Sequence, residues 1–164
     1  MANSNLSLWY DQPATVWARQ SLPIGNGRLG AMLFGGAPKE RIQFNEESLW
    51  IGDETNAGAY QAFGDVSVEL AHGKATGYRR ELDLHRAVHT VSYESDGVRY
   101  RREAFASFPA KIIVYRFTAD KPGALSGSVA LSDMHKGLDR RPRQSPELER
   151  FAGGLCLLRP QGHA

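Results

Sequence analysis

Two alternating segments joined by Asp96 and Gly97 constrain the fold of this chain more than any other feature. Apolar and polar residues alternate on both sides of this dipeptide, as they do in strands that bury one face. Asp-Gly between such segments is the strongest short-range signal for a β-hairpin, because both residues accept the positive φ angles of a tight turn. The sequence therefore predicts a hairpin whose second strand is 98–105. On the N-terminal side, 80–90 and 91–94 together indicate one longer strand.

Shorter segments of the same kind recur along the first 133 residues. Turn-forming residues separate them, for example the stretch 120–123 (DKPG). The expected strands are 6–10, 31–34, 40–44, 66–70, 111–118 and 126–131. Short strands at this spacing, without a long helical pattern or an internal repeat, are typical of an all-β fold, an antiparallel sandwich or barrel. We also expect a loop that begins at Trp17 and a single helical turn capped by Asn45.

Gly25, Gly27 and Gly30 form a G-x-G-x-x-G pattern, which in other proteins binds dinucleotides. That function needs a long helix that begins at the glycines and holds the pyrophosphate at its N-terminus. Only the four apolar residues 31–34 follow before two further glycines, so a short buried strand is predicted instead. We therefore expect Gly25 and Gly27 to supply positive φ angles in a tight connection between two strands. Nucleotide binding is the weaker alternative.

Length and composition exclude several classes of protein. With 164 residues, of which 41% are hydrophobic, the chain forms one domain at most. No apolar run approaches the roughly 20 residues of a membrane span, and no signal-peptide pattern is visible at the N-terminus. We expect no membrane partner, and the cellular location stays open. A single cysteine, Cys156, excludes an internal disulfide and a metal site built from several thiolates.

The chain changes character after residue 133. Residues 1–133 carry 14 Lys and Arg against 15 Asp and Glu, a net charge of −1, whereas 134–164 carry six against three, a net charge of +3. Three of the eight prolines lie in the last 23 residues, where no strand with a partner is visible. We predict an incomplete β-sandwich domain in 1–133 and a disordered or out-of-frame basic tail in 134–164. The short basic cluster in this tail is interrupted by proline and does not predict nucleic-acid binding.

Several collinear motifs within residues 6–133 resemble the N-terminal part of glycoside hydrolase family 95, the α-L-fucosidase and α-L-galactosidase group. The motifs are 8–10 (LWY), 12–14 (QPA), 22–36 (LPIGNGRLGAMLFGG), 41–50 (RIQFNEESLW), 60–65 (YQAFGD), 78–84 (YRRELDL), 91–93 (VSY) and 105–107 (FAS). The resemblance implies a β-sandwich that packs against an (α/α)6 barrel. It also implies an inverting exoglycosidase whose glutamic general acid and water-activating asparagines lie in the barrel. No residue here matches those catalytic motifs, so we expect the last strands, the linker and the barrel to be absent.

Four residues near the glycine pattern are candidates for interdomain or sugar contacts: Asn45, Glu46, Trp50 and Tyr60. Aromatic rings stack on sugars, but they serve equally well in a domain interface, and we favour the interface. Glu46 and Glu47 are adjacent carboxylates that suggest acid–base catalysis. Neighbours in sequence diverge on a helix or a strand, however, so they do not flank one substrate bond, and no catalytic residue is assigned.

Two other pairs are expected to be structural. Glu81 and Asp83 share a strand face, and we predict that they form cross-strand pairs with Arg79 and Arg101. His85 and His89 are four residues apart, as in helical metal sites, but the glutamate of H-E-x-x-H is missing and the surrounding pattern indicates a strand. The sequence therefore predicts neither a metal site nor a cofactor site.

Together these observations predict the non-catalytic N-terminal domain of an α-L-fucosidase- or α-L-galactosidase-like enzyme of carbohydrate degradation. Fucosylated or galactosylated glycans are expected as partners only through the barrel, and neither nucleic acid nor a membrane is expected. The alternative is a stand-alone carbohydrate-binding or protein-interaction module. Whether the chain is itself an enzyme stays open at this point.

Overall fold

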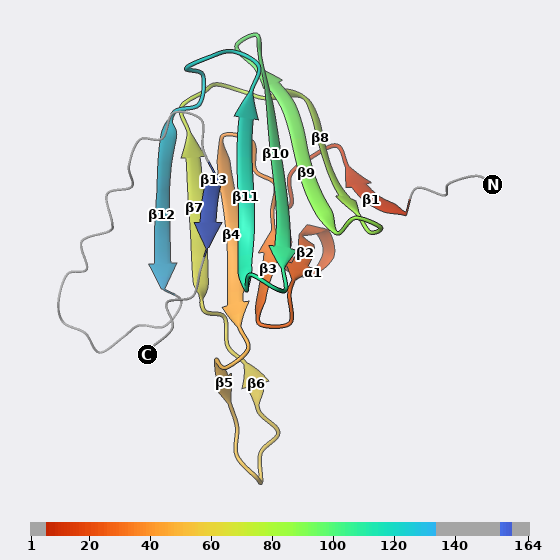
Figure 1. Cartoon of the computed structure of the whole chain (residues 1–164), viewed down its shortest axis with the longest axis vertical. Helices are drawn as coiled ribbons and strands as arrows, with labels where there is room; N and C mark the ends of the chain where they lie inside the picture. The colour runs from red at the N-terminus through yellow and green to blue at the C-terminus, as the bar shows by residue number, and fades with distance from the viewer. Residues whose placement is uncertain (1–5, 134–154, 159–164) are drawn as a thin grey trace, which may run out of the picture.

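The computed structural model describes residues 6–133 and, as a strand, residues 155–158. These residues form two large antiparallel sheets that face each other and one small two-stranded sheet (Figure 1). The six-stranded sheet has the order β1-β8-β9-β10-β11-β13, and the five-stranded sheet has the order β12-β7-β4-β3-β2. The first sheet contains β1 (Ser7–Tyr10), β8 (Thr76–Asp83), β9 (Val88–Ser95), β10 (Val98–Ser107), β11 (Ile112–Ala119) and β13 (Leu155–Leu158). The second contains β2 (Leu22–Gly25), β3 (Leu29–Leu33), β4 (Lys39–Glu46), β7 (Gly64–Leu70) and β12 (Gly127–Asp133). The predicted antiparallel sandwich is therefore confirmed.

The core lies between the two sheets and follows from the alternation within each strand. Leu29, Ala31 and Leu33 are buried on β3, and Val66 and Val68 are buried on β7, while the residues between them are more exposed. Because successive side chains of a strand point to opposite faces, the inward rows of both sheets meet in one apolar cluster. Burial of apolar surface contributes about 25 cal/mol per Å², so this cluster is the main source of stability.

A buried ion pair crosses the core and joins the two sheets. Arg102 Nη1 on β10 lies 2.8 Å from Glu40 Oε2 on β4, and the two residues are 2% and 1% exposed. Arg102 Nη2 also donates hydrogen bonds to the carbonyls of Gly36 and Ala37, and Glu40 Oε1 accepts one from the amide of Gly35. Burial raises the pKa of Glu40, and the charge of Arg102 opposes that shift. The pair thus fixes the loop that leads into β4.

The predicted single strand over 80–94 is wrong, because the chain reverses at residues 84–87 and forms the hairpin β8–β9. The Asp83 carboxylate accepts hydrogen bonds from the backbone N–H groups two and three residues later. Ala87 completes the turn with a φ of 53°. A side-chain cap therefore replaces the glycine or proline that usually marks such a turn.

The next hairpin, β9–β10, confirms the strongest sequence signal. Asp96 and Gly97 connect the two strands with φ angles of 51° and 68°, the positive values that a tight hairpin turn requires. Val98 pairs with Ser95 directly after the turn. The predicted strand pairing on both sides of the dipeptide is therefore present.

Two local predictions are wrong, because the backbone groups of these segments form other hydrogen bonds than the predicted structures require. The segment at Trp17 forms the short helix α1 (Trp17–Gln20) in place of the predicted loop, and Gln20 Oε1 accepts hydrogen bonds from the amides of Thr15 and Val16. Asn45 does not cap a helical turn. It lies within β4 and pairs with Gly30, because the ladder to β3 continues as far as Glu46.

The strands β5 (Trp50–Ile51) and β6 (Ala59–Tyr60) form a separate arm that projects beyond one end of the sandwich (Figure 1). Trp50 pairs with Tyr60, and the two rings pack edge to face with centroids 5.0 Å apart. Trp50, Ile51 and Tyr60 are 50%, 60% and 63% exposed. The arm therefore presents apolar side chains to the surroundings of the domain.

Most of the predicted tail, 134–154 and 159–164, lies outside the described residues, so its predicted disorder or frame change is untested. The four residues of β13 pair with β11, and the expectation that this stretch has no partner strand is wrong for them. The domain boundary at residue 133 stays a prediction. Within the described part of the chain, no helix has the length and apolarity that crossing a membrane requires.

Candidate functional site

Asn26 fastens the turn between β2 and β3 to the opposite sheet, at the end of the sandwich that carries the arm (Figure 1). Its Nδ2 donates to the carbonyls of Ser107 and Ile112, at 3.0 and 3.3 Å, which flank the β10–β11 turn. Its Oδ1 accepts hydrogen bonds from the amides of Arg28 and Leu29, at 3.1 and 2.8 Å. Asn26 is 6% exposed, so one buried amide both closes this turn and links the two sheets.

A row of three paired residues crosses the five-stranded sheet beside this turn. Gly25 of β2 pairs with Gly30 of β3, which pairs with Asn45 of β4. Two of the three residues have no side chain, so the row forms a depression bordered by the Asn45 amide. A Cβ atom added at Gly30 would meet no heavy atom within 4 Å. The missing side chains of Gly25 and Gly30 therefore leave a shallow depression on this face of the sheet.

Only one of the two predicted positive φ angles occurs. Gly27 has a φ of 84°, as expected, whereas Gly25 has no positive φ because it belongs to the extended strand β2. The strand β3 follows directly, so no helix begins at Gly30. The nucleotide alternative has no support among the residues that the structure describes, since a dinucleotide site needs that helix terminus.

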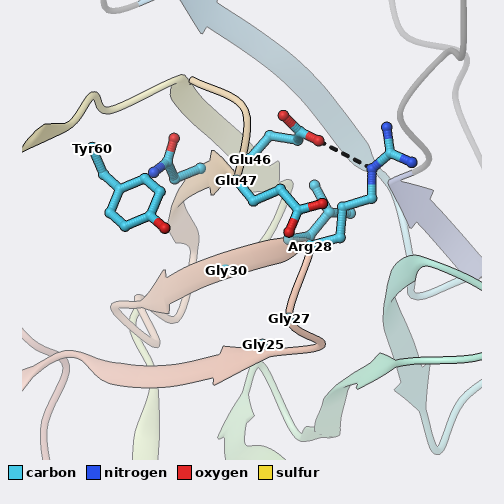
Figure 2. Close-up of a pocket in the computed structure, with 9 residues that line it drawn as sticks. Gly25, Gly27, Arg28, Gly30, Glu46, Glu47 and Tyr60 are labelled. Carbon is cyan, nitrogen blue, oxygen red and sulfur yellow. Dashed lines mark hydrogen bonds and ion pairs between the residues drawn. The ribbon is translucent and has the colours of Figure 1, made fainter. Parts of the chain in front are cut away.

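The depression is the floor of a pocket of about 260 Å³. Figure 2 shows the glycine backbone below, Tyr60 on one side, and Arg28, Glu46 and Glu47 on the other. Arg28 Nε and Glu46 Oε1 are 3.0 Å apart. The pocket thus combines an aromatic ring, two carboxylates and a guanidinium above bare backbone.

A second hollow of about 410 Å³ adjoins this pocket on the same face of the sheet. Gly30, Asn45 and Tyr60 line both, so the two hollows meet above the glycine row. The second hollow extends toward Trp17 of α1 and Met32 of β3. Its walls are more apolar, because proline, methionine, phenylalanine and tryptophan side chains contribute to them.

The charges of the pocket favour neutral ligands over anions. Ser48 donates to Glu46 Oε2 from its hydroxyl and its backbone amide, and Arg28 contacts the other oxygen. These contacts, the Ser48 hydroxyl first, lower the pKa of Glu46, so this carboxylate is ionised at neutral pH. Glu47 adds a second carboxylate. Two carboxylates against one guanidinium repel phosphate groups.

Asn45 contributes an unusual acceptor to the same pocket. Its Oδ1 is buried, and no described residue donates a hydrogen bond to it. A buried acceptor without a partner costs roughly 1–3 kcal/mol, so such groups normally bind water, a ligand or a partner protein. The atom therefore marks where an external donor would be stabilised.

The structure brings three of the four predicted contact residues together. Asn45, Glu46 and Tyr60 line the pocket, whereas Trp50 packs on the Tyr60 ring and is not part of the lining. Their roles as interdomain or sugar contacts stay predictions. Sequence reasoning missed Asn26, although an asparagine between two glycines in a predicted turn is a signal, since its side chain often bonds the backbone two residues on.

The two histidines do not form a site. His85 lies in the β8–β9 turn, and His89 is buried in the core at 1% exposure. Burial, with the charges of Arg102 and Arg80, lowers the pKa of His89 to about 3, so its ring is neutral. Residues 6–133 hold no group of three or more His, Cys, Asp or Glu side chains arranged to bind a metal ion.

Two further acidic residues, Glu81 and Asp53, have local structural partners. Glu81 pairs with Arg79 at 2.9 Å along its own strand, and Arg101 pairs with Glu103 at 2.9 Å along β10, so the predicted cross-strand pairs are wrong. Asp53 accepts hydrogen bonds from the backbone and side chains of Thr55 and Asn56 in the arm, which lower its pKa. The lowered pKa of Asp53 is the opposite of the raised pKa that a general acid needs.

The sequence matches known carbohydrate-active proteins over most of its length. Residues 8–62 and 53–156 match the family described as "Glycosyl hydrolase family 65, N-terminal domain". "Alpha-L-fucosidase 2" of Arabidopsis thaliana is 34% identical over an alignment of 192 residues, which covers 92% of this chain and 22% of that protein. "Probable alpha-fucosidase A" of Aspergillus niger is 27% identical over 70% of this chain and 20% of that protein. The protein of the same name from Aspergillus oryzae is 22% identical over 73% and 22%. The chain thus spans about a fifth of the length of these curated relatives.

Proposed function

This chain belongs to the family of glycosyl hydrolase family 65 N-terminal domains, and on that premise we propose that it docks onto the catalytic part of an α-L-fucosidase-type enzyme. Its resemblance to the N-terminal, non-catalytic region of such glycosidases is confirmed by these matches. The family number 95 is not confirmed, because the matching family carries the number 65. Membership of family 95 is therefore part of the proposal. The docking partner is the portion of the relatives that this chain does not cover.

The arm is the observation that carries the docking role. Its two strands pair over only two rows, and a two-stranded hairpin of this kind is marginally stable in water. The exposed side chains of Trp50 and Ile51 give it an apolar surface that packing against another domain would bury. Aromatic residues are enriched at the centres of such interfaces. The arm is therefore suited to pack against a neighbouring domain.

The two glutamates of β4 with shifted pKa values, Glu46 and Glu40, support assigning the chemistry to the docking partner. Inverting hydrolysis uses an acid of raised pKa and a base about 6.5–9.5 Å away on the opposite face of the sugar. Glu46 has a lowered pKa and is bound to Arg28 and Ser48. Glu40 has a raised pKa, but it is sealed in the core against Arg102. Neither residue suits the role of general acid.

A chimaera tests the proposal. This chain replaces the matching region of the Arabidopsis thaliana "Alpha-L-fucosidase 2", and hydrolysis of an aryl α-L-fucoside and the midpoint of thermal unfolding are measured. We expect an active chimaera in which Ile51→Ser lowers both quantities, because the substitution places a hydroxyl at the docked surface. Leu84→Ser is the matched control: Leu84 is an exposed leucine, 49% accessible, in the β8–β9 turn.

The outcome depends on the difference between the two variants. Loss of activity or thermal stability in Ile51→Ser alone supports docking through the arm. Equal behaviour of Ile51→Ser and Leu84→Ser in an active chimaera would refute the arm as the contact. A folded but inactive chimaera would refute the assignment of this chain to that position in a fucosidase-type enzyme.

A further inference from the structure

The pocket above Gly25 and Gly30 has a floor without side chains, and docking through the arm does not explain this floor. The floor is main chain at Gly25 and Gly30, and the position where a Gly30 side chain would stand is empty to 4 Å. An ordinary strand residue at Gly30 would fill this space without a clash. Bare backbone on the exposed face of a sheet therefore admits a ligand to close approach.

The walls offer hydrogen-bonding groups for a ligand rich in hydroxyls. Asn45 Oδ1 is buried without a donor among the described residues, and it borders the empty position because Asn45 pairs with Gly30. Glu47 supplies further acceptors and Arg28 supplies donors on the side of the pocket away from Tyr60 (Figure 2). A hydroxyl group both donates and accepts, so neighbouring hydroxyls of one ligand can satisfy amide, carboxylate and guanidinium together.

The aromatic wall and the charges narrow the ligand class. The Tyr60 ring is 63% exposed and stands beside the floor, so it offers an apolar face to a ring with C–H groups. The two carboxylates disfavour phosphates and sugar acids. The volume of 260 Å³ lies just below the roughly 300–1,000 Å³ typical of small-molecule sites, and the adjoining hollow of 410 Å³ can take a second unit.

We propose that this pocket binds one neutral pyranose, with its ring against Tyr60 and a hydroxyl donated to Asn45 Oδ1. The linked sugar or the aglycone extends over the adjoining hollow toward Trp17. The proposal does not depend on docking through the arm, because every residue that it uses belongs to this chain. It makes the domain a sugar-binding module in addition to its place in a larger enzyme.

The test is a titration of the 15N-labelled chain, followed by amide chemical shifts. The probes are methyl α-L-fucopyranoside, methyl β-D-galactopyranoside and inorganic phosphate. We expect saturable shifts centred on residues 25–30, 45–47 and 60 with at least one glycoside and none with phosphate. In Gly30→Val the affinity is expected to fall about tenfold or more, because the new side chain occupies the floor.

Ala130→Val is the matched control. Ala130 lies exposed on β12 of the same sheet, and valine there adds the same β-branched side chain away from the pocket. If Gly30→Val does not give a folded spectrum, Gly30→Ala and Asn45→Ala take its place. Weaker sugar binding in the pocket variants, with unchanged binding in Ala130→Val, supports the site.

Three results would overturn the proposal. They are the absence of saturation by either glycoside up to about 100 mM, equal affinity of the pocket variants and the parent, and phosphate binding to the same amides. Failure of the chimaera leaves this test intact, since the titration uses only the present chain. Conversely, an active chimaera whose Ile51→Ser variant is impaired stands even if no sugar binds here.

Discussion

Replacing Asn26 with alanine removes four hydrogen bonds from the turn that forms the pocket floor. Two link β2–β3 to the carbonyls of Ser107 and Ile112, and two close the turn onto the amides of Arg28 and Leu29. Each neutral hydrogen bond contributes about 0.5–1.5 kcal/mol, so the sum is about 2–6 kcal/mol. At 6% exposure little water can replace the lost partners. We expect the free energy of unfolding to fall by about 3 kcal/mol, which lowers the Tm by roughly 10 °C.

Asn26→Asp separates the two halves of this interaction. The carboxylate keeps both acceptor bonds but faces the carbonyls of Ser107 and Ile112 without a proton to donate. Burial and these carbonyls raise its folded pKa above the unfolded value, so the folded state binds the proton more tightly. The stability of Asn26→Asp is therefore expected to increase as the pH falls through the folded pKa toward the unfolded value near 4.

Urea unfolding followed by far-UV circular dichroism measures both effects. Asn56→Ala is the control, because Asn56 also makes several side-chain hydrogen bonds but is exposed in the arm, and we expect little change. A loss below about 1 kcal/mol in Asn26→Ala would refute the argument that this amide holds the two sheets together. No recovery of Asn26→Asp relative to the parent on acidification would refute the role given to the two carbonyls.

Two further predictions concern the buried polar groups of the core. Arg102→Met leaves the Glu40 carboxylate buried without its partner, so we expect a loss of about 3–5 kcal/mol in urea unfolding. Adding Glu40→Leu should recover most of that loss, and a double variant as unstable as the single one would contradict the explanation. His89 has a folded pKa of about 3 against 6.5 when unfolded, so its contribution to stability decreases as the pH falls from 6.5 toward 3. His89→Gln should lose less stability than the parent over that range, by at most about 1.4 kcal/mol per pH unit; identical pH profiles would contradict the neutral buried ring.

The hairpins show which part of the fold was predictable from sequence. Asp96 and Gly97 identify their turn because their residue types tolerate positive φ. The β8–β9 turn has no such signal, since residues 84–87 (LHRA) contain neither glycine nor proline. It depends on the Asp83 carboxylate and on a positive φ at Ala87, which tertiary structure must stabilise. The alternating sequence pattern alone therefore predicted one strand where the structure has two, β8 and β9.

For the candidate site, the sequence predicted some of the residues but not the pocket that they form. Asn45, Glu46 and Tyr60 were identifiable from their residue types, because amide, carboxylate and aromatic side chains suit sugar or interdomain contacts. The pocket itself follows from strand register, which places Gly25, Gly30 and Asn45 in one row, and register across three strands is not visible in a single sequence. The contacts of Asn26 with the other sheet cannot be read from the sequence either, because Ser107 and Ile112 lie more than 80 residues away.

The buried ion pair illustrates the same point within the core. Glu40 falls on the inward face of β4 together with Ile42, where alternation predicts an apolar residue. Its partner Arg102 lies 62 residues later on the other sheet. Only the sandwich brings the two charges together, so sequence patterns could not distinguish this pair from exposed charges.

In the proposed function, this chain is a docking domain and the glycosidase chemistry belongs to its partner. The most direct measurement is hydrolysis of an aryl α-L-fucoside by the purified 164-residue chain, with the active chimaera as the positive control. We predict no turnover above the buffer rate for the chain alone and clear turnover for the chimaera. Turnover that co-purifies with the chain through gel filtration and is abolished by Glu46→Gln would contradict the account.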